Sequence, residues 1–240
     1  MSFSFGRPRR HFRLTGSTND EARALALAGA PSGTVVTAAE QDAGRGRHGR
    51  RWSAPADSAL LLSAILRPLD DRQALLPLAV PLAVCEAIES LAAVECGVKW
   101  PNDVWIGERK VAGVLIEARP PEWAVIGAGI NLSIGPGEFP GDLRWPATSV
   151  GRGAGPDEAF RALAASLPRW VAADAGDVVA AFAARDALRG REVSWEGAGD
   201  EGSGSGVAAG IDSRGDLLVQ AADGERVALG AGEVSLLVSA

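Results

Sequence analysis

The sequence predicts an α+β protein: a mixed or antiparallel sheet with flanking helices, followed by a small β domain. Helical and strand patterns do not alternate regularly, as they would in a doubly wound parallel sheet. Instead, a long apolar helical stretch is followed by consecutive strand-like runs. Short strand-like pieces separated by turn residues then fill the C-terminal part of the chain, which is typical of a small barrel.

Helices are predicted in three regions. The first, over residues 17–28, opens with Ser-Thr-Asn before acidic residues and ends at a glycine-containing turn. The second, over residues 75–93, is almost wholly apolar and should be buried. Its Pro77 and Pro81 are expected in the opening turns or at a kink. The alanine-rich stretch 156–188 predicts two more helices.

Strands are predicted where β-branched and apolar runs are bounded by turn residues. In the first part of the chain these runs are 34–40, 58–66, 98–106, 110–118 and 122–132. A tight turn at Gly107-Glu108 should join the third run to the fourth, and residues 133–147, rich in Gly and Pro, predict a surface loop.

The last part of the chain predicts a second domain. Its strand-like pieces are 192–195, 207–211, 217–220, 226–229 and 234–238. Turn-rich segments separate them, including residues 196–206. We therefore expect two domains, 1–188 and 189–240, the second a small β-barrel.

Composition limits the kinds of partner. The formal net charge of −6 argues against wholesale binding to nucleic acid or to an anionic membrane. Cys85 and Cys96 have no metal-binding spacing and no matching histidine cluster, so they are predicted to be buried, reduced thiols. The basic N-terminus has no apolar core like that of a signal peptide, and no apolar run is expected to reach the roughly 20 residues of a membrane span. These features favour a cytoplasmic protein without membrane contacts.

Positive charge is concentrated in one segment, residues 44–52, which we call the Arg loop. It reads Gly-Arg-Gly-Arg-His-Gly-Arg-Arg-Trp and follows a predicted strand. Like charges there repel by roughly 0.7 kcal/mol per pair at about 6 Å in water, so the loop should become ordered on a polyanion. The alternative is a solvated Arg/Gly turn in an RNA-binding module. The acidic balance of the chain and the single aromatic, Trp52, speak against it.

The two lysines of the chain form a second candidate constellation. Lys99 and Lys110 lie in runs otherwise made of Val, Trp and Ile, with Asn102 and Asp103 between them. Two adjacent strands could direct all four side chains to one end of the sheet. Asp103 could fix a lysine, bind a metal, accept a proton or simply serve as a turn residue.

A glycine-containing strand is the third candidate. Gly127-Ala128-Gly129 lacks the third glycine of a dinucleotide fingerprint, and no crossover helix follows it. Its glycines instead predict a site where a flat ligand lies against the strand.

Together these segments resemble the ordered signature of the biotin–protein ligases. The matching stretches are GSTND, EQDAGRGRHGRRW, KWPNDVWIGERKVAGVLIEA and GAGINL, within about residues 11–150. The resemblance implies the biotin–lipoate ligase catalytic fold, which is similar to class II aminoacyl-tRNA synthetases, with a small C-terminal SH3-like β-barrel. A lipoate–protein ligase of the same fold is the nearest alternative.

The resemblance implies a two-step acyl transfer with biotin and ATP as substrates and Mg²⁺. Biotin and ATP give biotinyl-5′-AMP and pyrophosphate, and a lysine of a biotin carboxyl carrier protein or domain then accepts the biotin. Only sixteen residues precede Ser17, too few for the DNA-binding domain of repressor members, so no DNA partner is expected. A homodimer is possible in this family.

The resemblance also implies roles for individual residues. Those at biotin-binding positions are Ser17, Thr18, Asn19, Gln41, Arg45, Gly46, Arg47, Lys110, Gly113 and Gly129. Those on the side of ATP or the adenylate are Arg45, Arg47, Trp52, Lys99, Asn102, Lys110, Asn131 and Trp145. Catalysis is expected first of Lys110, then of Arg47 and Asp103, while the metal ligands stay unassigned.

Overall fold

A computed structural model describes residues 5–141, 143, 145–151, 153–196, 202–230 and 233–236. Its larger sheet contains β1 (Arg9–Thr15), β2 (Val35–Gln41), β3 (Ala59–Leu66), β4 (Cys96–Lys99), β5 (Asp103–Ile106), β6 (Arg109–Arg119) and β7 (Trp123–Asn131). The strand order is β1-β2-β3-β7-β6-β5-β4. The pair β1–β2 is parallel and the other neighbours are antiparallel, so the predicted mixed sheet is confirmed.

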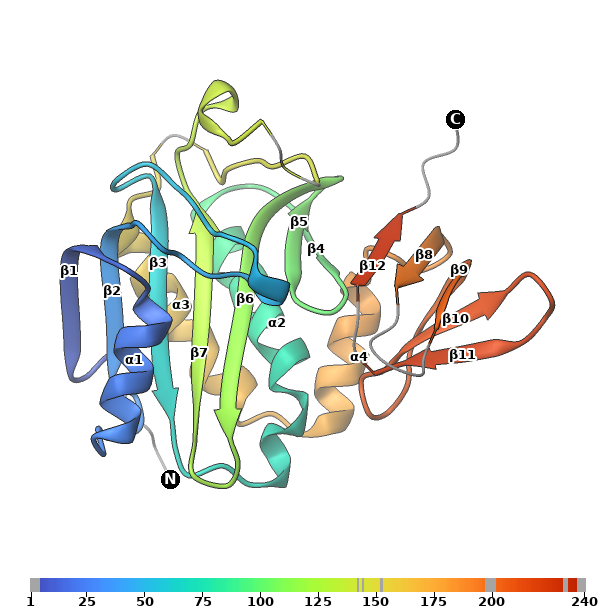
Figure 1. Cartoon of the computed structure of the whole chain (residues 1–240), viewed down its shortest axis with the longest axis horizontal. Helices are drawn as coiled ribbons and strands as arrows, with labels where there is room; N and C mark the ends of the chain where they lie inside the picture. The colour runs from blue at the N-terminus through green and yellow to red at the C-terminus, as the bar shows by residue number, and fades with distance from the viewer. Residues whose placement is uncertain are drawn as a thin grey trace.

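Helices cover both faces of this sheet (Figure 1). They are α1 (Thr18–Leu27), α2 (Leu76–Leu91), α3 (Pro156–Val171) and α4 (Ala175–Arg185). Three short 3₁₀ turns accompany them, η1 (Arg47–Gly49), η2 (Asp71–Leu75) and η3 (Pro136–Glu138). Strand β3 is buried along its whole length because Leu60 and Leu62 belong to the core under α2 and α3, whereas Ile65 packs with α1.

The long apolar helix is a core element, as predicted. Pro77 lies in the first turn of α2, and Pro81 lies inside it among buried residues. The stretch Asp71–Leu91 has the length and apolar composition of a membrane span, which corrects the expectation that no run would reach it. Of its most apolar window, 67% is buried inside the protein, as in the core helix of a globular fold.

Two features of the sheet differ from the sequence-based prediction. Strand β1 was not expected, because its charged residues are mostly exposed and carry no apolar pattern; it forms at the sheet edge, where one side faces solvent. The predicted strand 98–106 is in fact the hairpin β4–β5, with Lys99 paired to Asp103. Pro101 lies in the turn, where its missing N–H interrupts no ladder.

The second sheet contains β8 (Glu192–Glu196), β9 (Ser203–Ile211), β10 (Leu217–Ala221), β11 (Arg226–Leu229) and β12 (Glu233–Leu236). Its order is β11-β10-β9-β8-β12, and every pair is antiparallel. Strand β9 begins inside the segment predicted as turns. Among the described strands no pairing joins β11 to β12, so an antiparallel sheet is present and its closure into a barrel stays a prediction. The predicted end of the last strand, 237–238, lies outside the described residues.

The two cysteines are free and buried, as predicted. Cys85 lies on α2 and Cys96 on β4. A hydrogen bond to Cys96 and burial raise the pKa of the Cys85 thiol, which therefore stays protonated and unreactive.

An ion pair between Glu89 on α2 and Arg185 on α4 also contacts the start of β4 at Cys96. Glu89 Oε1 and Oε2 accept from the two terminal nitrogens of Arg185 at 2.6 and 2.8 Å, and Glu89 also accepts from the backbone N–H of Cys96. The hydrogen bond from Arg185 holds the pKa of Glu89 below its ordinary 4.5. Its stabilisation is therefore present above the unfolded-state pKa and is lost as the pH falls through the folded-state pKa.

We expect Glu89→Gln to lower the free energy of unfolding by about 1–2 kcal/mol at neutral pH, because one charge-assisted pair is lost. Urea denaturation of both proteins at neutral pH and near pH 3 checks this. The difference should shrink at the lower pH, and an equal difference at both values would contradict the assignment.

Candidate active site

A cavity of about 700 Å³ lies at the end of the larger sheet where α1 begins. The Arg loop, the turn between β4 and β5, strands β6 and β7 and the loop after β7 surround it. Every residue that the sequence placed at the site lines this cavity: Ser17, Thr18, Asn19, Gln41, Arg45, Gly46, Arg47, Trp52, Lys99, Asn102, Asp103, Lys110, Gly113, Gly129, Asn131 and Trp145. The fold thus brings together segments more than a hundred residues apart.

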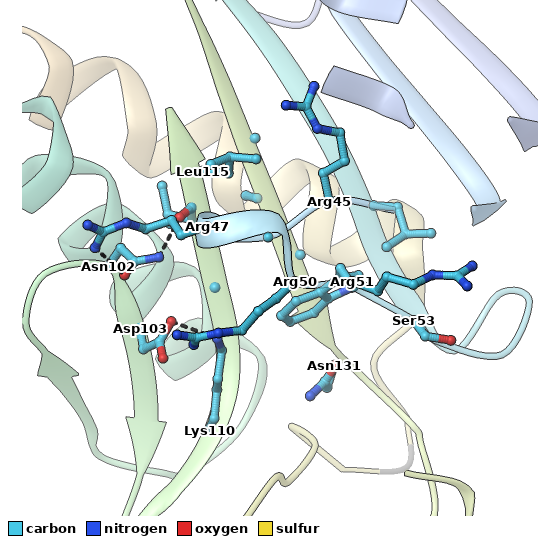
Figure 2. Close-up of a pocket in the computed structure, with 18 of the residues that line it drawn as sticks. Arg45, Arg47, Arg50, Arg51, Ser53, Asn102, Asp103, Lys110, Leu115 and Asn131 are labelled. Carbon is cyan, nitrogen blue, oxygen red and sulfur yellow. Dashed lines mark hydrogen bonds and ion pairs between the residues drawn. The ribbon is translucent and has the colours of Figure 1, made fainter. Parts of the chain in front are cut away.

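Lys110 and Asp103 form the central ion pair of the cavity (Figure 2). Lys110 Nζ lies 2.7 Å from Asp103 Oδ1, and both side chains are mostly buried. The hairpin register explains this, because Asp103 begins β5 and pairs with Gly113 on the same strand that carries Lys110. Of the roles left open for Asp103, fixing a lysine is the one this geometry favours.

Arg47 points from the Arg loop toward Asn102, next to Asp103, and Arg50 extends toward Asp103 and Lys110 (Figure 2). Its guanidinium donates to Asn102 Oδ1 at 3.2 Å, and Asn102 Nδ2 donates to the carbonyl of Val114 at 2.7 Å. Burial lowers the pKa of Arg47; Asp103 opposes this shift and Arg50 adds to it. Arg47, Arg50 and Lys110 line the cavity together with one carboxylate, Asp103, which leaves an excess of positive charge suited to an anionic ligand.

His48 contributes little of that charge. Burial, then Arg47 and Arg50, lower the pKa of its imidazole, so it is neutral at pH 7. Its backbone is left-handed, with φ of 54°. His48 therefore adds no fixed positive charge to the cavity at neutral pH.

Arg45 lies apart from the other cations of the loop (Figure 2). Its guanidinium is 2.8 Å from Asp20 Oδ1 on α1 and 3.4 Å from Glu117 Oε1 on β6. Arg51 also turns away from Lys110 and donates to the carbonyl of Asp42. The structure therefore brings Arg47 to Asn102, near Asp103, and pairs Arg45 with carboxylates of α1 and β6 instead.

Trp52 fills the slot that the glycines of β6 and β7 leave open. A Cβ at Gly129 would lie 2.4 Å from Trp52 Cε2, and one at Gly113 would lie 3.1 Å from the same indole. Lys110 Nζ is 5.6 Å from the centre of a Trp52 ring, and Trp52 Nε1 is buried without a hydrogen-bond partner. In this structure the side chain of Trp52 lies against Gly113 and Gly129, while the flat ligand predicted at the glycines of β7 stays a prediction.

Residues predicted for the nucleotide side gather at the other end of the cavity. Lys99 is buried, donates to the carbonyl of Val234 on β12 at 2.7 Å, and lies 5.4 Å from the centre of a Trp145 ring. Asn131 Nδ2 donates to the carbonyl of Thr148 at 3.1 Å. The contact of Lys99 with Val234 was not predicted, because a backbone carbonyl leaves no recognisable pattern in the sequence.

Ser63 on β3 was also missed. Its hydroxyl is fully buried and lies within hydrogen-bond distance of Thr18 and Asn19 at the start of α1. The signal available was a lone serine in the otherwise apolar run Ala-Leu-Leu-Leu-Ser-Ala-Ile-Leu, since a buried hydroxyl needs partners.

The part of the chain that the structure describes holds no group of three or more His, Cys, Asp or Glu side chains able to bind a metal ion. Asp103 is the carboxylate among the described lining residues. The donor set fits a Mg²⁺ ion that keeps most of its waters and binds mainly through phosphate oxygens.

A mixed sheet that presents a basic loop and a Lys–Asp pair to one cavity defines an enzyme site for anionic, carboxylate- or phosphate-bearing substrates. The chain belongs to the Biotin/lipoate A/B protein ligase family, which it matches over residues 11–131. Residues 190–237 match the Biotin protein ligase C terminal domain.

Individual relatives agree with this assignment. The chain is 36% identical to the biotin–[acetyl-CoA-carboxylase] ligase of Mycobacterium tuberculosis, covering 92% of this chain and 85% of the relative. It is 39% identical to the bifunctional ligase/repressor BirA of Bacillus subtilis over 59% of this chain, which is 46% of that relative's length. The structure of the Aquifex aeolicus biotin protein ligase in complex with biotin and ATP superposes with a TM-score of 0.83 at 27% identity, covering 97% of this chain and 100% of the other.

Proposed function

We propose that the cavity binds biotin at the α1 end and ATP toward Lys99, with the reacting atoms between Arg47 and Lys110. The chain is an ATP-dependent biotin ligase: it activates biotin to biotinyl-5′-AMP and transfers the biotinyl group to a lysine. The observation that carries the proposal is the convergence of Arg47 and Lys110, from separate segments, beside Asp103 in one cavity.

The chemistry needs this excess of positive charge. The carboxylate of biotin attacks the α-phosphate of ATP, so two anionic groups must approach and pyrophosphate must leave. Fixed cations stabilise the transition state by offsetting its charge. We propose that Lys110 contacts both the carboxylate and the α-phosphate, that Arg47 holds the phosphate from the loop side, and that Asp103 orients Lys110.

A Mg²⁺ ion bound with ATP would offset charge on the triphosphate. Asp103, the carboxylate among the described lining residues, would be the side chain to hold it, directly or through a water.

In the second step the amine of an acceptor lysine attacks the mixed anhydride and releases AMP. The relatives named biotin–[acetyl-CoA-carboxylase] ligases support a carboxylase as the acceptor, through its biotin carboxyl carrier domain. We further propose that residues 1–188 form the catalytic unit, that residues 189–240 form the C-terminal unit, and that the protein acts in the cytoplasm. Pairing of two copies and the lack of a DNA partner stay predictions.

A single experiment tests the proposed function. The purified chain is incubated with biotin, ATP, Mg²⁺ and a biotin carboxyl carrier domain, and the intact mass of the acceptor is measured. One added biotinyl group, absent without ATP and absent on an acceptor whose target lysine is changed to arginine, is the expected result. Transfer of lipoate in preference to biotin would favour the rival ligase. Retention of labelled RNA without transfer of either acid would favour the RNA-binding module.

The Arg loop should become resistant to protease when the substrates bind. Gly44, Gly46 and Gly49 allow the backbone to move, and the arginines between them gain phosphate partners in the complex. We expect trypsin cleavage after the arginines at 45–51 to slow about tenfold or more with biotin and ATP together. Limited proteolysis followed by peptide mass mapping measures this, with cleavage after exposed Arg226 as the internal reference. Equally slow cleavage of the Arg loop with and without biotin and ATP would contradict the prediction that ligands order the loop.

A further inference from the structure

Ser63 occupies an unusual place for a polar side chain. All of β3 is buried, and Ser63 is fully inaccessible to solvent. Its Oγ lies 2.6 Å from Asn19 Oδ1 and 2.8 Å from Thr18 Oγ1, and its strand position pairs with Gly127 on β7. The hydroxyl does not line the cavity, so any role it has is exerted through Thr18 and Asn19.

The donor and acceptor of each hydrogen bond in the chain Glu117–Asn19–Ser63–Thr18 follow from the carboxylate of Glu117 at its start. Asn19 Nδ2 lies 2.9 Å from Glu117 Oε2, and a carboxylate oxygen only accepts, so the NH₂ group of Asn19 must face Glu117. Asn19 Oδ1 then faces Ser63, in space left by the missing side chain of Gly127, whose Cβ would lie 2.1 Å away. An amide oxygen also only accepts, so Ser63 gives its single proton to Asn19.

The same reasoning sets the polarity of Thr18. Because Ser63 has only lone pairs left to offer, the hydroxyl proton of Thr18 must point at Ser63. Since Thr18 lines the cavity, its Oγ1 can offer a ligand there only a hydrogen-bond acceptor. Beside it, Gln41 Oε1 accepts from the backbone N–H of Thr18 at 2.7 Å, which leaves Gln41 Nε2 as a donor. This end of the cavity offers a fixed acceptor next to a fixed donor.

We propose that Ser63 is a positioning residue that fixes the hydrogen-bonding polarity of Thr18 and so selects a ligand with an N–H group beside a carbonyl. The ureido ring of biotin has that arrangement, and the dithiolane ring of lipoate has neither group. The inference rests on the proposed function and deepens it, because it assigns the choice between the two acids to a buried chain running Glu117–Asn19–Ser63–Thr18. A site built to pair a polar group discriminates strongly against a ligand that cannot pair with it.

The test is Ser63→Ala, assayed with biotin and with an analogue in which the ring N–H facing Thr18 is replaced by oxygen, a cyclic carbamate of nearly the same shape. Both carbamate isomers are assayed, so that the correct nitrogen is covered. In the unaltered protein the oxygen meets the acceptor Thr18, and biotin should be preferred. In Ser63→Ala the Thr18 hydroxyl is free to rotate and donate. We expect KM for biotin to rise about tenfold, KM for ATP to stay within about twofold, and the preference for biotin over the carbamate to fall at least about tenfold.

The matched control is Ser166→Ala. Ser166 is also a buried serine, and its hydroxyl donates to the carbonyl of Ala83 at 2.8 Å between α3 and α2, on the other face of the sheet. It should lose similar stability without any change in the preference.

The preference is a ratio measured within one protein, so a smaller folded fraction of Ser63→Ala does not alter it. An unchanged preference for biotin over both carbamates in Ser63→Ala overturns the inference while the proposed function stands. Failure of the unaltered protein to transfer biotin would instead remove the proposed function.

Discussion

Replacing Lys110 with alanine should reduce biotinyl-adenylate formation about 10²–10³-fold while biotin still binds. The ammonium lies 2.7 Å from Asp103 in a mostly buried position, where charge is poorly screened. No other residue of β6 near the cavity carries a positive charge there, because the neighbouring Arg109 is exposed. Losing Lys110 therefore removes charge stabilisation where it develops in the transition state, and it leaves Asp103 as an anion facing two incoming anions.

The measurement is biotin-dependent pyrophosphate release, with biotin affinity followed separately by calorimetry. Arg109→Ala is the control, since it removes one positive charge from the adjacent, solvent-facing position. We expect the control to stay within about twofold of the unaltered protein. Pyrophosphate release by Lys110→Ala at the unaltered rate would exclude the catalytic role.

Replacing Arg47 with glycine should speed release of the adenylate from the enzyme about 10–100-fold. Arg47 is a cation of the Arg loop that lies near Asp103, and its contact with Asn102 ties the loop to the β4–β5 turn. Without that contact and without the charge–phosphate hydrogen bonds, each worth about 1.5–3 kcal/mol, the loop should close poorly over the intermediate. Released adenylate would then acylate exposed lysines without specificity.

Stopped-flow displacement of preformed biotinyl-5′-AMP gives the off-rate. Arg51→Gly is the matched control, because it removes the same charge and adds the same flexibility four residues away, from a side chain that turns away from Lys110. If both variants release the adenylate equally fast, loop flexibility is responsible and the specific role of Arg47 is wrong. An adenylate off-rate of Arg47→Gly equal to that of the unaltered protein would also show that the proposed role of Arg47 is wrong.

Much of the candidate site was predictable because its signals are local. The Arg loop is recognisable from its composition, and Lys99, Asn102, Asp103 and Lys110 form a compact pattern of scarce polar residues between apolar ones. The turn was predicted at Gly107 because glycine readily adopts a left-handed backbone, and Gly107 does so with a φ of 59°. Placement in one cavity then followed from the resemblance to the ligase family, and the structure agrees with it.

The individual side-chain contacts of the site could not be predicted from the sequence. Arg45 and Arg47 are two residues apart and look alike in the sequence, yet one pairs with Asp20 and Glu117 while the other reaches Asn102. The difference arises because the carboxylates that capture Arg45 come from α1 and β6. Trp52 likewise covers Gly113 and Gly129 only because the Arg loop folds back over β6 and β7.

The sequence by itself determined the class of fold, the chemistry of the Arg loop and the grouping of Lys99, Asp103 and Lys110 as candidates, because turn residues, strand runs and scarce charges are properties of neighbours along the chain. That Lys110 is the lysine paired with Asp103 was decided by the tertiary structure. The tertiary structure decided that β1 pairs in parallel at the edge, that Lys99 bonds to Val234, and that Ser63 links Thr18 to Asn19. These contacts join residues 26–135 positions apart. Their geometry depends on how whole helices and strands pack, and no short segment carries that information.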